Sequence, residues 1–481
     1  MSADTIFALA SGSSRAAIAV LRVSGAASGP AVAALCGGVL PAPRHASLRR
    51  LRDRSGALLD HALVLWLPGP ASYTAEDSAE LHLHGGRSVI DGVAAALTEA
   101  GLRPAEAGEF TRRAFLNGRM DLLEAEAVHD LVAAETEAQR RQALRQLEGA
   151  LGALYQDWAD RLRGLLAYQE ALIDFPDEDL PAEVEQQLLT TLRAVRGEIQ
   201  DHLNDAGRGE KLREGLFFAI TGAPNVGKST LINALAEREV AIVSDIPGTT
   251  RDALETRVVL GGVPVTLVDT AGLREAGDSI EAEGVRRALA RARDADLVMV
   301  VVEAGSGAPA APPFGEPGGL LLAGPGYLLP AGPGYLLPAG PGYLLPVGPG
   351  YLLPAGPGYL LPAGPGHLLI ANKADLGLEG PPNALRISAM TGLGMAELRA
   401  RLAEAVRHMT ESSGPPPLTQ ARHRAALLRA ADHLDAAERA DLAELRGEDL
   451  RLAMRALGRI TGHVGVEDIL DTVFSRFCIG K

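Results

Sequence analysis

A glycine-rich loop between an apolar run and a helix-like segment constrains the fold of this chain more than any other feature. Leu216–Thr221 is the apolar run, Gly222–Thr230 reads Gly-Ala-Pro-Asn-Val-Gly-Lys-Ser-Thr, and Leu231–Ala236 continues at helical spacing. Glycines followed by Lys and Ser at these intervals form a Walker A motif. In such a loop backbone N–H groups surround phosphate oxygens, Lys228 offers a positive charge to the β- and γ-phosphates, and the Ser229 hydroxyl can ligate Mg²⁺. Because strand and helix stand where the motif requires them, a chance glycine turn is disfavoured and the stretch predicts a P-loop nucleotide-binding domain.

Three later motifs predict that the nucleotide carries guanine. Asp269-Thr-Ala-Gly272 ends an apolar run and offers a carboxylate to the Mg²⁺ shell and a glycine N–H to the γ-phosphate. Asn372-Lys-Ala-Asp375 ends another apolar run. Asp375 can accept hydrogen bonds from guanine N1–H and the exocyclic amine, a pair that adenine does not present. Ser388-Ala389 is the usual further support for the base, and four motifs in this order are far more specific than any one of them.

The residue that follows the Asp269 motif distinguishes classes of GTPase. Leu273 stands where small signalling GTPases carry the glutamine that orients the attacking water. Two alternatives could activate water: Glu281 in the following loop, or a monovalent cation held by Asn225 and the loop Ser244–Thr250. A cation bridging the phosphates would supply the charge that an arginine finger supplies in other GTPases.

Length and composition exclude several classes of protein. A chain of 481 residues, 47% of them hydrophobic, is long enough for two to four domains. It has no run of 18 apolar residues and no basic segment followed by an apolar one at its start, so we expect neither a membrane span nor a secretion signal. Its two cysteines, Cys36 and Cys478, fit a reducing cytoplasm without disulfides or a zinc site. A formal charge of −14 argues against indiscriminate binding of phosphate backbones and is compatible with a local basic patch.

Shifts in composition divide the chain into four segments. Residues 1–118 mix strand-like and helix-like runs and predict an α/β domain. Residues 119–212 and 411–481 are both rich in apolar positions at helical spacing. Each helical block has only the other block to pack against. We therefore expect one helical domain that is interrupted by a G domain at 213–410. The expected fold class is multidomain α/β plus α, with an inserted Ras-like P-loop G domain.

Some residues in these segments have two interpretations. His82 and His84 share one strand face and could be two metal ligands, but no third ligand is evident and structural histidines are the alternative. Arg140-Arg141 and Arg161-Leu-Arg163 form either a tRNA-facing stripe or the solvated face of a helix. Apolar positions at helical spacing over Leu418–Glu444 and Glu448–Phe477 predict a second helical block.

An octapeptide repeat lies inside the expected G domain. Gly324-Pro-Gly-Tyr-Leu-Leu-Pro-Ala331 recurs four times and then degenerates into Gly364-Pro-Gly-His-Leu-Leu-Ile-Ala371, which is also the strand expected before Asn372. We place the low-complexity insert at residues 305–366. Two prolines and two glycines per unit are incompatible with a regular helix and disfavour a central strand. The array is interpreted as a mostly disordered loop or as a Pro-rich docking segment.

The chain resembles the MnmE (TrmE) family of tRNA modification GTPases over essentially its whole length except the repeat array. The residues that carry the resemblance are Ser72-Tyr-Thr with Glu76-Asp77, the block Glu109–Leu122, Asn225–Thr230, Asp245–Asp252 and the terminal Cys478-Ile-Gly-Lys481. The block that begins at Glu109 and the cysteine tail are the more specific of these, since many relatives share the GTPase motifs.

The resemblance implies an N-terminal domain that binds 5-formyl- or 5,10-methylene-tetrahydrofolate and forms a homodimer. It implies a cytoplasmic, potassium-dependent GTPase that joins a MnmG-like flavoprotein in a heterotetramer. Together they would add an aminomethyl or carboxymethylaminomethyl group to C5 of the wobble uridine of certain tRNAs. GTP, Mg²⁺, K⁺ and the folate are the implied cofactors of this chain, and FAD and NADH those of the partner.

The resemblance also implies residue roles. It places K⁺ at Asn225, Ser244, Ile246 and Thr249, Mg²⁺ at Ser229 and Thr250, the catalytic carboxylate at Glu281, and the folate at Arg22, Glu80, Arg119 and Lys481. The residues expected around GTP are Asn225, Val226, Gly227, Lys228, Ser229, Thr230, Ser244, Asp245, Ile246, Pro247, Gly248, Thr249, Thr250, Asp269, Thr270, Ala271, Gly272, Asn372, Lys373, Ala374, Asp375, Ser388 and Ala389.

Other functions stay open at this point. A ribosome-assembly GTPase of the Era or Der type would gate RNA binding and carry a KH-like module with a GXXG loop after the G domain, whereas the segment after residue 410 is helical in pattern. A scaffold with an inactive G domain is disfavoured by the intact motifs. Cys478 is either a thiol that serves tRNA modification, activated by nearby Lys481, or a small buried hydrophobe in the closing helix.

Overall fold

The structure, a computed structural model, divides into two compact units. The first comprises Met1–Ala133, Ala143–Asn204 and Gln420–Lys481, and the second Ala134–Gln142 and Asp205–Thr419. The described residues are 4–12, 16–174, 182–237, 255–269, 295–306, 328–331, 335–338, 344–347, 351–354, 366–411, 414–462, 464, 467–475 and 477–480. Among these residues, no helix combines the length and apolar character needed to cross a bilayer.

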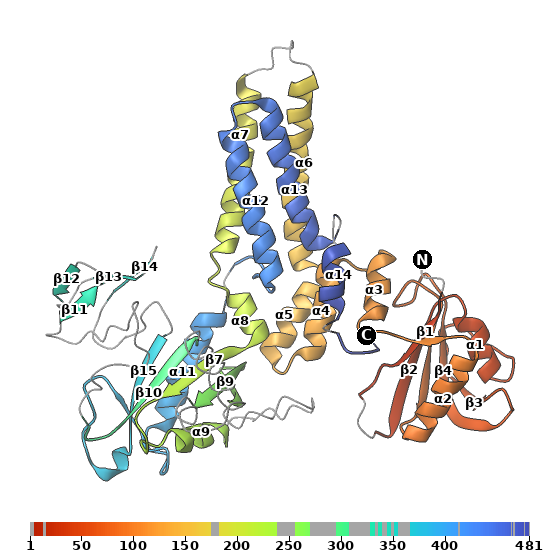
Figure 1. Cartoon of the computed structure of the whole chain (residues 1–481), viewed down its shortest axis with the longest axis horizontal. Helices are drawn as coiled ribbons and strands as arrows, with labels where there is room; N and C mark the ends of the chain where they lie inside the picture. The colour runs from red at the N-terminus through yellow and green to blue at the C-terminus, as the bar shows by residue number, and fades with distance from the viewer. Residues whose placement is uncertain are drawn as a thin grey trace, which may run out of the picture. The chain divides into compact units, whose positions relative to one another are not determined.

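The first unit begins with a six-stranded sheet in the order β3-β4-β5-β2-β1-β6. Its strands are β1 (Ile6–Leu9), β2 (Ile18–Ser24), β3 (Ser47–Arg52), β4 (Leu58–Leu67), β5 (Ser78–His84) and β6 (Arg103–Pro104). Neighbours are antiparallel except β1 and β6. Alternation along β5 buries Ala79, Leu81 and Leu83 and turns Glu80 and His82 to the other face. The buried face packs against α1 (Ser28–Leu35) and α2 (Arg87–Glu99), as Figure 1 shows.

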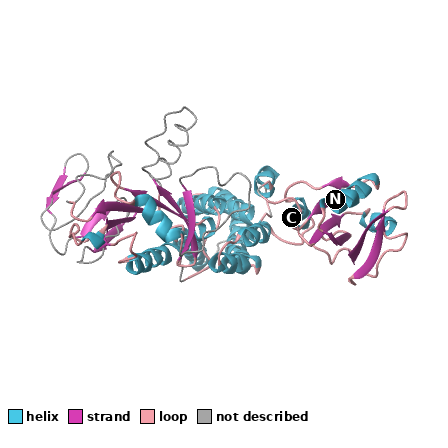
Figure 2. Ribbon diagram, turned by 90° about the horizontal axis from the view of Figure 1, so that it is seen from below, coloured by secondary structure: helices cyan, strands magenta, loops and turns pink. Residues whose placement is uncertain are grey.

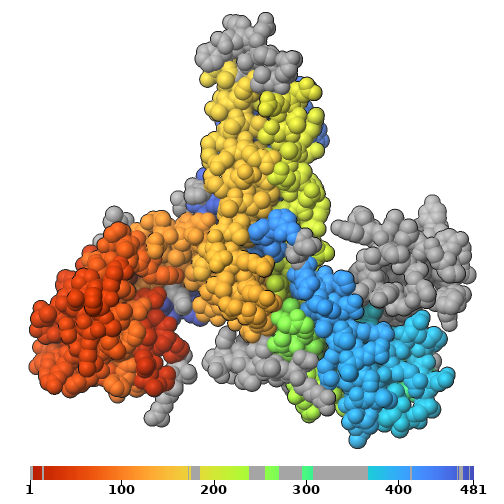
Figure 3. Space-filling view, turned by 180° about the vertical axis from the view of Figure 1, so that it is seen from behind, coloured from red at the N-terminus to blue at the C-terminus, as the bar shows by residue number. Residues whose placement is uncertain are grey.

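The rest of this unit is helical. Its helices are α3 (Glu109–Leu116), α4 (Leu122–Ala133), α5 (Glu137–Leu147, which straddles the unit boundary), α6 (Ala150–Asp174), α7 (Ala182–Leu203), α12 (Ala421–Arg439), α13 (Ala443–Thr461) and α14 (Glu467–Phe474). The long helices α6 and α7 of the first block lie side by side (Figure 3) and pack against α12 and α13 of the second. The bundle consists of helices alone, cyan in Figure 2. The expected association of the two helical blocks is thereby confirmed.

The second helical block contains a break. Within the predicted range Glu448–Phe477, α13 ends at Thr461 and α14 starts at Glu467. Gly462 causes the break, because it adopts a φ of 91° that other residues rarely adopt. A Cβ at this position would also lie 2.6 Å from the ring of Phe115.

The second unit is built on a six-stranded sheet in the order β16-β15-β10-β7-β9-β8. Its strands are β7 (Leu216–Thr221), β8 (Glu255–Leu260), β9 (Val263–Asp269), β10 (Leu297–Glu303), β15 (Gly366–Asn372) and β16 (Leu385–Arg386). All neighbours are parallel except β8 and β9. The helices of this unit are α8 (Arg208–Glu214), α9 (Lys228–Ala236) and α11 (Met395–Thr410), with a 3₁₀ turn η2 (Ala374–Leu376). The predicted P-loop G domain is confirmed, and its parallel strands present their carboxyl ends at one edge.

The repeat array falls in the connection between β10 and β15, which pair in parallel. Its described residues form two separate antiparallel hairpins, made of β11 (Leu328–Ala331), β12 (Tyr335–Pro338), β13 (Leu344–Val347) and β14 (Tyr351–Pro354). Each hairpin uses two successive copies of the octapeptide. These residues depart from the expected disordered loop because a two-stranded ribbon has only edge strands, where proline is tolerated. As expected, none of them joins the central sheet.

Candidate functional site

The P-loop connects β7 to α9, and other segments of the same chain lie close to its two glycines. At Gly222 a Cβ would lie 2.1 Å from the Val301 carbonyl oxygen, and at Gly227, whose φ is 92°, it would lie 2.3 Å from Asn372 Nδ2. Asn225 has a φ of 63°, a conformation that asparagine adopts more readily than most residues. The two glycines are therefore required because the P-loop backbone passes too close to Val301 and Asn372 for a Cβ to fit.

Lys228 and Ser229 occupy the first turn of α9. The buried Lys228 ammonium donates to the carbonyl oxygens of Gly222 (3.1 Å) and Ala223 (2.8 Å), which holds it inside the loop. The Ser229 hydroxyl donates to Asp269 Oδ2 at 3.0 Å, at the end of β9. A hydroxyl and a carboxylate oxygen placed together are ligands that Mg²⁺ prefers, so this pair fits a magnesium ion.

Asn372 joins the base-recognition segment to the P-loop. Its Nδ2 donates to the Val226 carbonyl oxygen at 2.8 Å, and its Oδ1 accepts the Ala389 N–H at 3.0 Å. Ser388 is buried beside it, whereas Asp375 is exposed in η2 and open to a ligand. One amide thus fixes the relative positions of three motifs that are separate in sequence. Sequence reasoning assigned Asn372 to the base motif and missed this bracing role, for which the tight glycine at 227 was the available signal.

Glu303 is a second residue that sequence reasoning left without a role at the site. It is the last residue of β10 and lies in register with Asn372 on β15. Its Oε1 is 3.0 Å from Lys373 Nζ, and Lys373 itself has a φ of 64°. Ala374 then donates its N–H to the Ile387 carbonyl oxygen at 2.9 Å. These contacts hold the turn that presents Asp375.

Of the residues predicted to contact the nucleotide, Asn225–Thr230, Asp269, Asn372–Asp375 and Ser388–Ala389 are described, and all lie at the carboxyl edge of the sheet. Thr230 is exposed in the first turn of α9. The other expected residues lie outside the described residues: Ser244, Asp245, Ile246, Pro247, Gly248, Thr249, Thr250, Thr270, Ala271, Gly272, Glu281 and, for the folate, Lys481.

A second site lies on the N-terminal sheet, on the face away from α1 and α2. Arg22 and Glu80 are register partners on β2 and β5, and Glu80 Oε1 accepts from Arg22 Nε (3.2 Å) and Nη2 (2.9 Å). The guanidinium lies 5.1 Å from the ring centre of Tyr73 and 5.8 Å from that of Phe110. Burial by itself would raise the pKa of Glu80, but the hydrogen bond and charge of Arg22 outweigh it and keep that pKa below its usual value.

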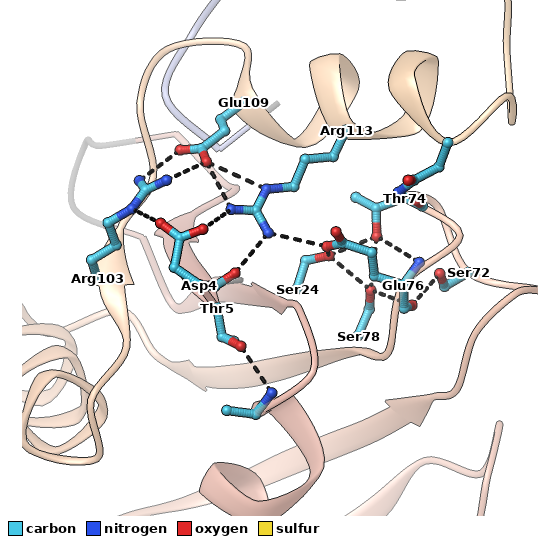
Figure 4. Close-up of polar contacts among 12 residues, drawn as sticks. Asp4, Thr5, Ser24, Ser72, Thr74, Glu76, Ser78, Arg103, Glu109 and Arg113 are labelled. Atoms are coloured by element: carbon cyan, nitrogen blue, oxygen red, sulfur yellow. Dashed lines mark hydrogen bonds and ion pairs between the residues drawn. The ribbon is translucent and has the colours of Figure 1, made fainter. Parts of the chain in front are cut away.

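A buried polar network lies next to this site, and Figure 4 shows its polar residues. Arg113 on α3 is 5% exposed and donates to Glu109 Oε1 (2.9 Å), Glu76 Oε2 (3.2 Å) and the Asp4 carbonyl oxygen (3.0 Å). Glu76 Oε2 also accepts from the Ser24 hydroxyl at 2.9 Å. The segments that carry Tyr73 and Phe110 are adjacent in sequence to Glu76 and Glu109, so the network fixes both rings. The Ser72 and Glu109 sequence blocks therefore support the site from behind.

The C-terminal tail returns to the same sheet. Ile479 forms an antiparallel bridge with Ala107, and a Cβ on Gly480 would lie 2.2 Å from the Leu9 carbonyl oxygen at the end of β1. Leu9 is the register partner of Leu21, which precedes Arg22. Cys478 is exposed and lies beyond the end of α14. The interpretation of Cys478 as a buried hydrophobe in the closing helix is therefore wrong.

The remaining folate candidate stands apart from this pair. Arg119 is exposed in the turn after α3, where its N–H donates to the Ala114 carbonyl oxygen at 2.8 Å. Within the described structure its side chain makes no hydrogen bond or ion pair with Arg22 or Glu80.

The two histidines considered as metal ligands have carboxylate neighbours. His82 Nε2 is 3.5 Å from Glu80 Oε2, and His84 Nδ1 is 2.7 Å from Asp60 Oδ1. Over the residues described here, no group of three or more His, Cys, Asp or Glu side chains is arranged to hold a metal ion. The structural interpretation of His82 and His84 is the one these contacts favour.

The helix arginines considered as a tRNA-facing stripe are all paired with carboxylates. Arg140 and Arg141 lie beside Glu137, Arg161 beside Asp157 and Glu198, and Arg163 beside Asp160. Neighbours three or four residues apart on one helix form such pairs routinely. The solvated-face interpretation is therefore favoured for these arginines.

The segment that follows the nucleotide motifs in the sequence is helical. After α11 the described residues form α12, α13 and α14, without the helix–GXXG–strand arrangement of a KH module in that part of the chain. This disfavours the ribosome-assembly alternative.

Comparison with known proteins covers the whole chain. The family models described as "GTP-binding protein TrmE N-terminus" and "MnmE helical domain" match residues 5–119 and 122–478. The tRNA modification GTPase MnmE of Gluconacetobacter diazotrophicus is 56% identical, with 99% of this chain and 98% of the relative covered. That of Granulibacter bethesdensis is 53% identical, with 100% of both covered. Among solved structures, the G domain of the T. maritima FeoB iron transporter matches 40% of this chain and 98% of that chain at 20% identity, with a TM-score of 0.21, too low to support a statement about fold.

Proposed function

This chain belongs to the MnmE family of tRNA modification GTPases, and we propose that it couples potassium-dependent GTP hydrolysis to modification of the wobble uridine at C5. It is a GTPase that acts in tRNA modification. The proposed product carries an aminomethyl or carboxymethylaminomethyl group, and the proposed partner is a MnmG-like flavoprotein that holds FAD and NADH. We further propose a cytoplasmic homodimer with domain limits at 1–118, 119–212, 213–410 and 411–481.

Hydrolysis is assigned to the carboxyl edge of the G-domain sheet. Mg²⁺ at Ser229 and Thr250, and K⁺ at Asn225, Ser244, Ile246 and Thr249, supply positive charge to the phosphates when bound. Lys228 and the backbone N–H groups of the P-loop hold the phosphates, and Asp375 selects guanine. Glu281 orients the attacking water and accepts its proton, the role that Leu273 cannot fill. Asn372 keeps the phosphate and base segments in register.

Hydrolysis rates in potassium and in sodium test the cation assignment, since Na⁺ is too small for the same ligand set. We expect markedly faster turnover in potassium, and equal rates would contradict it. Glu281→Ala should slow hydrolysis by roughly 10²–10⁴-fold, the range of a positioned proton acceptor. GTP affinity should barely change, because Glu281 acts on water and not on ground-state phosphate contacts.

The observation that supports the carbon chemistry most directly is the Arg22–Glu80 pair beneath Tyr73 and Phe110. Hydrolysis of GTP can reorient domains but transfers no carbon, so a second site must hold a one-carbon donor. A tetrahydrofolate would supply that carbon when bound. A carboxylate beside aromatic rings suits the amine edge and flat ring of a pterin, and the guanidinium of Arg22 suits a glutamate carboxylate. Arg119 and Lys481 are the other proposed contacts.

The exposed thiol of Cys478 is the proposed chemical group of the tail, which runs beside β1. Cys478→Ser should reduce wobble-uridine modification while potassium-dependent hydrolysis stays intact. Cys36→Ser removes a thiol that is half-buried in the N-terminal domain and is the matched control. Mass spectrometry of wobble uridines from a deletion strain complemented with each variant measures the outcome. Normal modification by the Cys478 variant would leave the thiol without a chemical role.

A further inference from the structure

The strand β3 at one edge of the N-terminal sheet carries a run of arginines in a chain whose formal charge is −14. Five arginines and one aspartate lie between positions 44 and 54. Arg49, Arg50 and Arg52 are on β3 itself and Arg54 is in the turn that follows, and these four define the β3 arginine strip. The strip is positively charged, whereas the net charge of the chain is negative.

The strip is open to solvent. Leu48, Arg50 and Arg52 alternate on the outward face of β3, and Arg50, Arg52 and Arg54 are all exposed. β3 pairs with β4 on one side only, so its second edge is unpaired within the sheet (Figure 1). On β4 the register partner of Arg50 is His61, which is also exposed. A ligand can therefore reach the guanidinium groups from the face and from the edge.

Within the part of the chain that the structure describes, the three exposed arginines of the strip form no ion pair with a carboxylate. In the described structure Arg50, Arg52 and Arg54 form no ion pair, and the only hydrogen bond among the three is from Arg52 Nη1 to the Gly56 carbonyl oxygen at 2.7 Å. The exposed helix arginines described above behave differently, since Arg140, Arg141 and Arg163 each lie beside a carboxylate. Uncompensated like charges on adjacent positions repel each other, so a strip of this kind is costly unless a negative ligand binds it.

Protection of a sheet edge does not account for the strip. Charged side chains, prolines and short length all protect sheet edges, and the opposite edge, β6, has only two residues and carries Pro104. Four cations within six positions exceed that need.

We propose that the β3 arginine strip binds the phosphate backbone of the tRNA, a role that rests on the proposed function in tRNA modification. Alternate residues of a strand are about 6.6–6.8 Å apart, a separation of the same order as that of successive phosphates along an RNA strand. Guanidinium groups bind phosphate oxygens through two parallel hydrogen bonds. Contacts of this kind orient the nucleic acid without reading its sequence. The strip therefore positions the tRNA against the N-terminal domain, and the acidic remainder of the chain keeps it from binding elsewhere.

The test compares two triple variants of the full chain that lose the same charge. Arg50→Gln, Arg52→Gln and Arg54→Gln together should weaken binding of unmodified tRNA by about tenfold or more, and reduce the slope of log affinity against log salt by about 2. Arg140→Gln, Arg141→Gln and Arg163→Gln together should leave affinity and slope unchanged. The corresponding Arg→Lys triple at 50, 52 and 54 should keep the slope, because each lysine retains the charge. Thermal unfolding and tRNA-free GTP hydrolysis should be those of the wild type for all three.

Several outcomes would overturn the inference. Wild-type tRNA affinity and salt slope in the Gln triple would remove the strip from the tRNA contact while leaving the proposed function intact. Unchanged tRNA binding with weaker binding of polyglutamate would assign the strip to an acidic protein. A lysine triple that loses the slope as fully as the Gln triple would mean that local unfolding, and not charge, caused the effect. Failure of the wild-type chain to bind tRNA at all would count against the proposed function as well.

Discussion

The nucleotide site and the Arg22–Glu80 site are built in opposite ways. At the first, contiguous motifs follow the ends of parallel strands and most contacts use backbone groups or short side chains beside them. At the second, the participating residues come from β2, β5, α3 and the segment before β5, and the tail arrives from the far end of the chain. The residues of the first site lie in short contiguous stretches of sequence, whereas those of the second come together only when the sheet has formed.

This difference determines how each site fails. A backbone-based site is sensitive to a single added methyl group where the chain passes close to itself, and insensitive to changes farther away. A site assembled from distant side chains depends on the polar network behind it. Substitutions chosen for one construction should therefore leave the other unaffected.

The largest expected effect on nucleotide binding is at Gly227. Gly227→Ala places a Cβ 2.3 Å from Asn372 Nδ2 at a φ of 92°. Backbone strain of about 1–2 kcal/mol and loss of the Asn372 hydrogen bond together come to about 3 kcal/mol, or about 100-fold weaker GTP binding in a fluorescent-nucleotide titration. Gly262→Ala is the control, since Gly262 has a φ of 81° but nothing within 4 Å of its Cβ position. Equal affinity in the two variants would show that the close approach to Asn372 is unimportant.

The largest expected effect on stability is at Arg113, behind the second site. Arg113→Met leaves the carboxylate of Glu76 without its buried partner, whereas Glu109 keeps its ion pair with Arg103. The N-terminal domain should be destabilised by about 3–5 kcal/mol. Arg112→Met, on the same helix, removes an ion pair to the exposed Asp471 and should cost less than about 1 kcal/mol. Urea unfolding followed by fluorescence measures both. GTP affinity should not change in either variant, and a matching loss of GTP binding would contradict the separation of the two sites.

Low pH should lower the unfolding free energy of the helical domain through Glu126. Its ion pairs with Arg422 and His423 also join residues that are far apart in the sequence. Burial by itself would raise the pKa of Glu126, but the charges and hydrogen bonds of Arg422 and His423 lower it to about 2. A carboxyl group whose pKa is lower in the folded state than in the unfolded state stabilises the folded protein. The full contribution is present at pH values above the usual pKa of about 4.5. That contribution, about 3 kcal/mol, is lost as the pH falls from about 4.5 to about 2.

Glu126→Gln should therefore reduce the change of the unfolding free energy across this pH window. Urea titration at successive pH values measures this change. Glu137→Gln removes an exposed carboxylate whose pKa is lowered by the hydrogen bond from Arg140, and it should change the curve far less because solvent screens that ion pair. The same pH dependence in the Glu126 variant and the wild type would place the acid-sensitive group elsewhere.

The smallest effect is expected from the repeat array. Deletion of residues 340–355 removes two whole octapeptides and the hairpin of β13 and β14. Loop length contributes only about 0.6 kcal/mol per doubling, so GTP hydrolysis should stay within about twofold of the wild-type rate. Deletion of residues 364–371 removes most of β15 and should abolish nucleotide binding. Loss of binding in the first deletion would mean that the hairpins support the G domain.

Much of the nucleotide site was predictable from sequence because its chemistry depends on chain geometry. Gly222 and Gly227 mark where the backbone turns and approaches its neighbours, and an apolar run before Asp269 or Asn372 marks a strand whose end faces the ligand. The bracing by Asn372 of Val226 and Ala389 was not predictable, since these positions become neighbours only when β7 and the segment after β16 reach the same edge of the sheet. The break in the C-terminal helix was missed because the apolar spacing continues through Gly462.

By itself the sequence determined the order of the segments, the P-loop and the guanine motif, since each of these is set by local backbone preference and by apolar spacing. Only the tertiary structure decided that Arg22 meets Glu80 beside Tyr73, that Cys478 is exposed beside the N-terminal sheet, and which of the described arginines form no ion pair with a carboxylate. The physical reason is the strand register and the packing of the tail. Both bring together side chains that are far apart in the chain, and neither leaves a periodic pattern in the sequence.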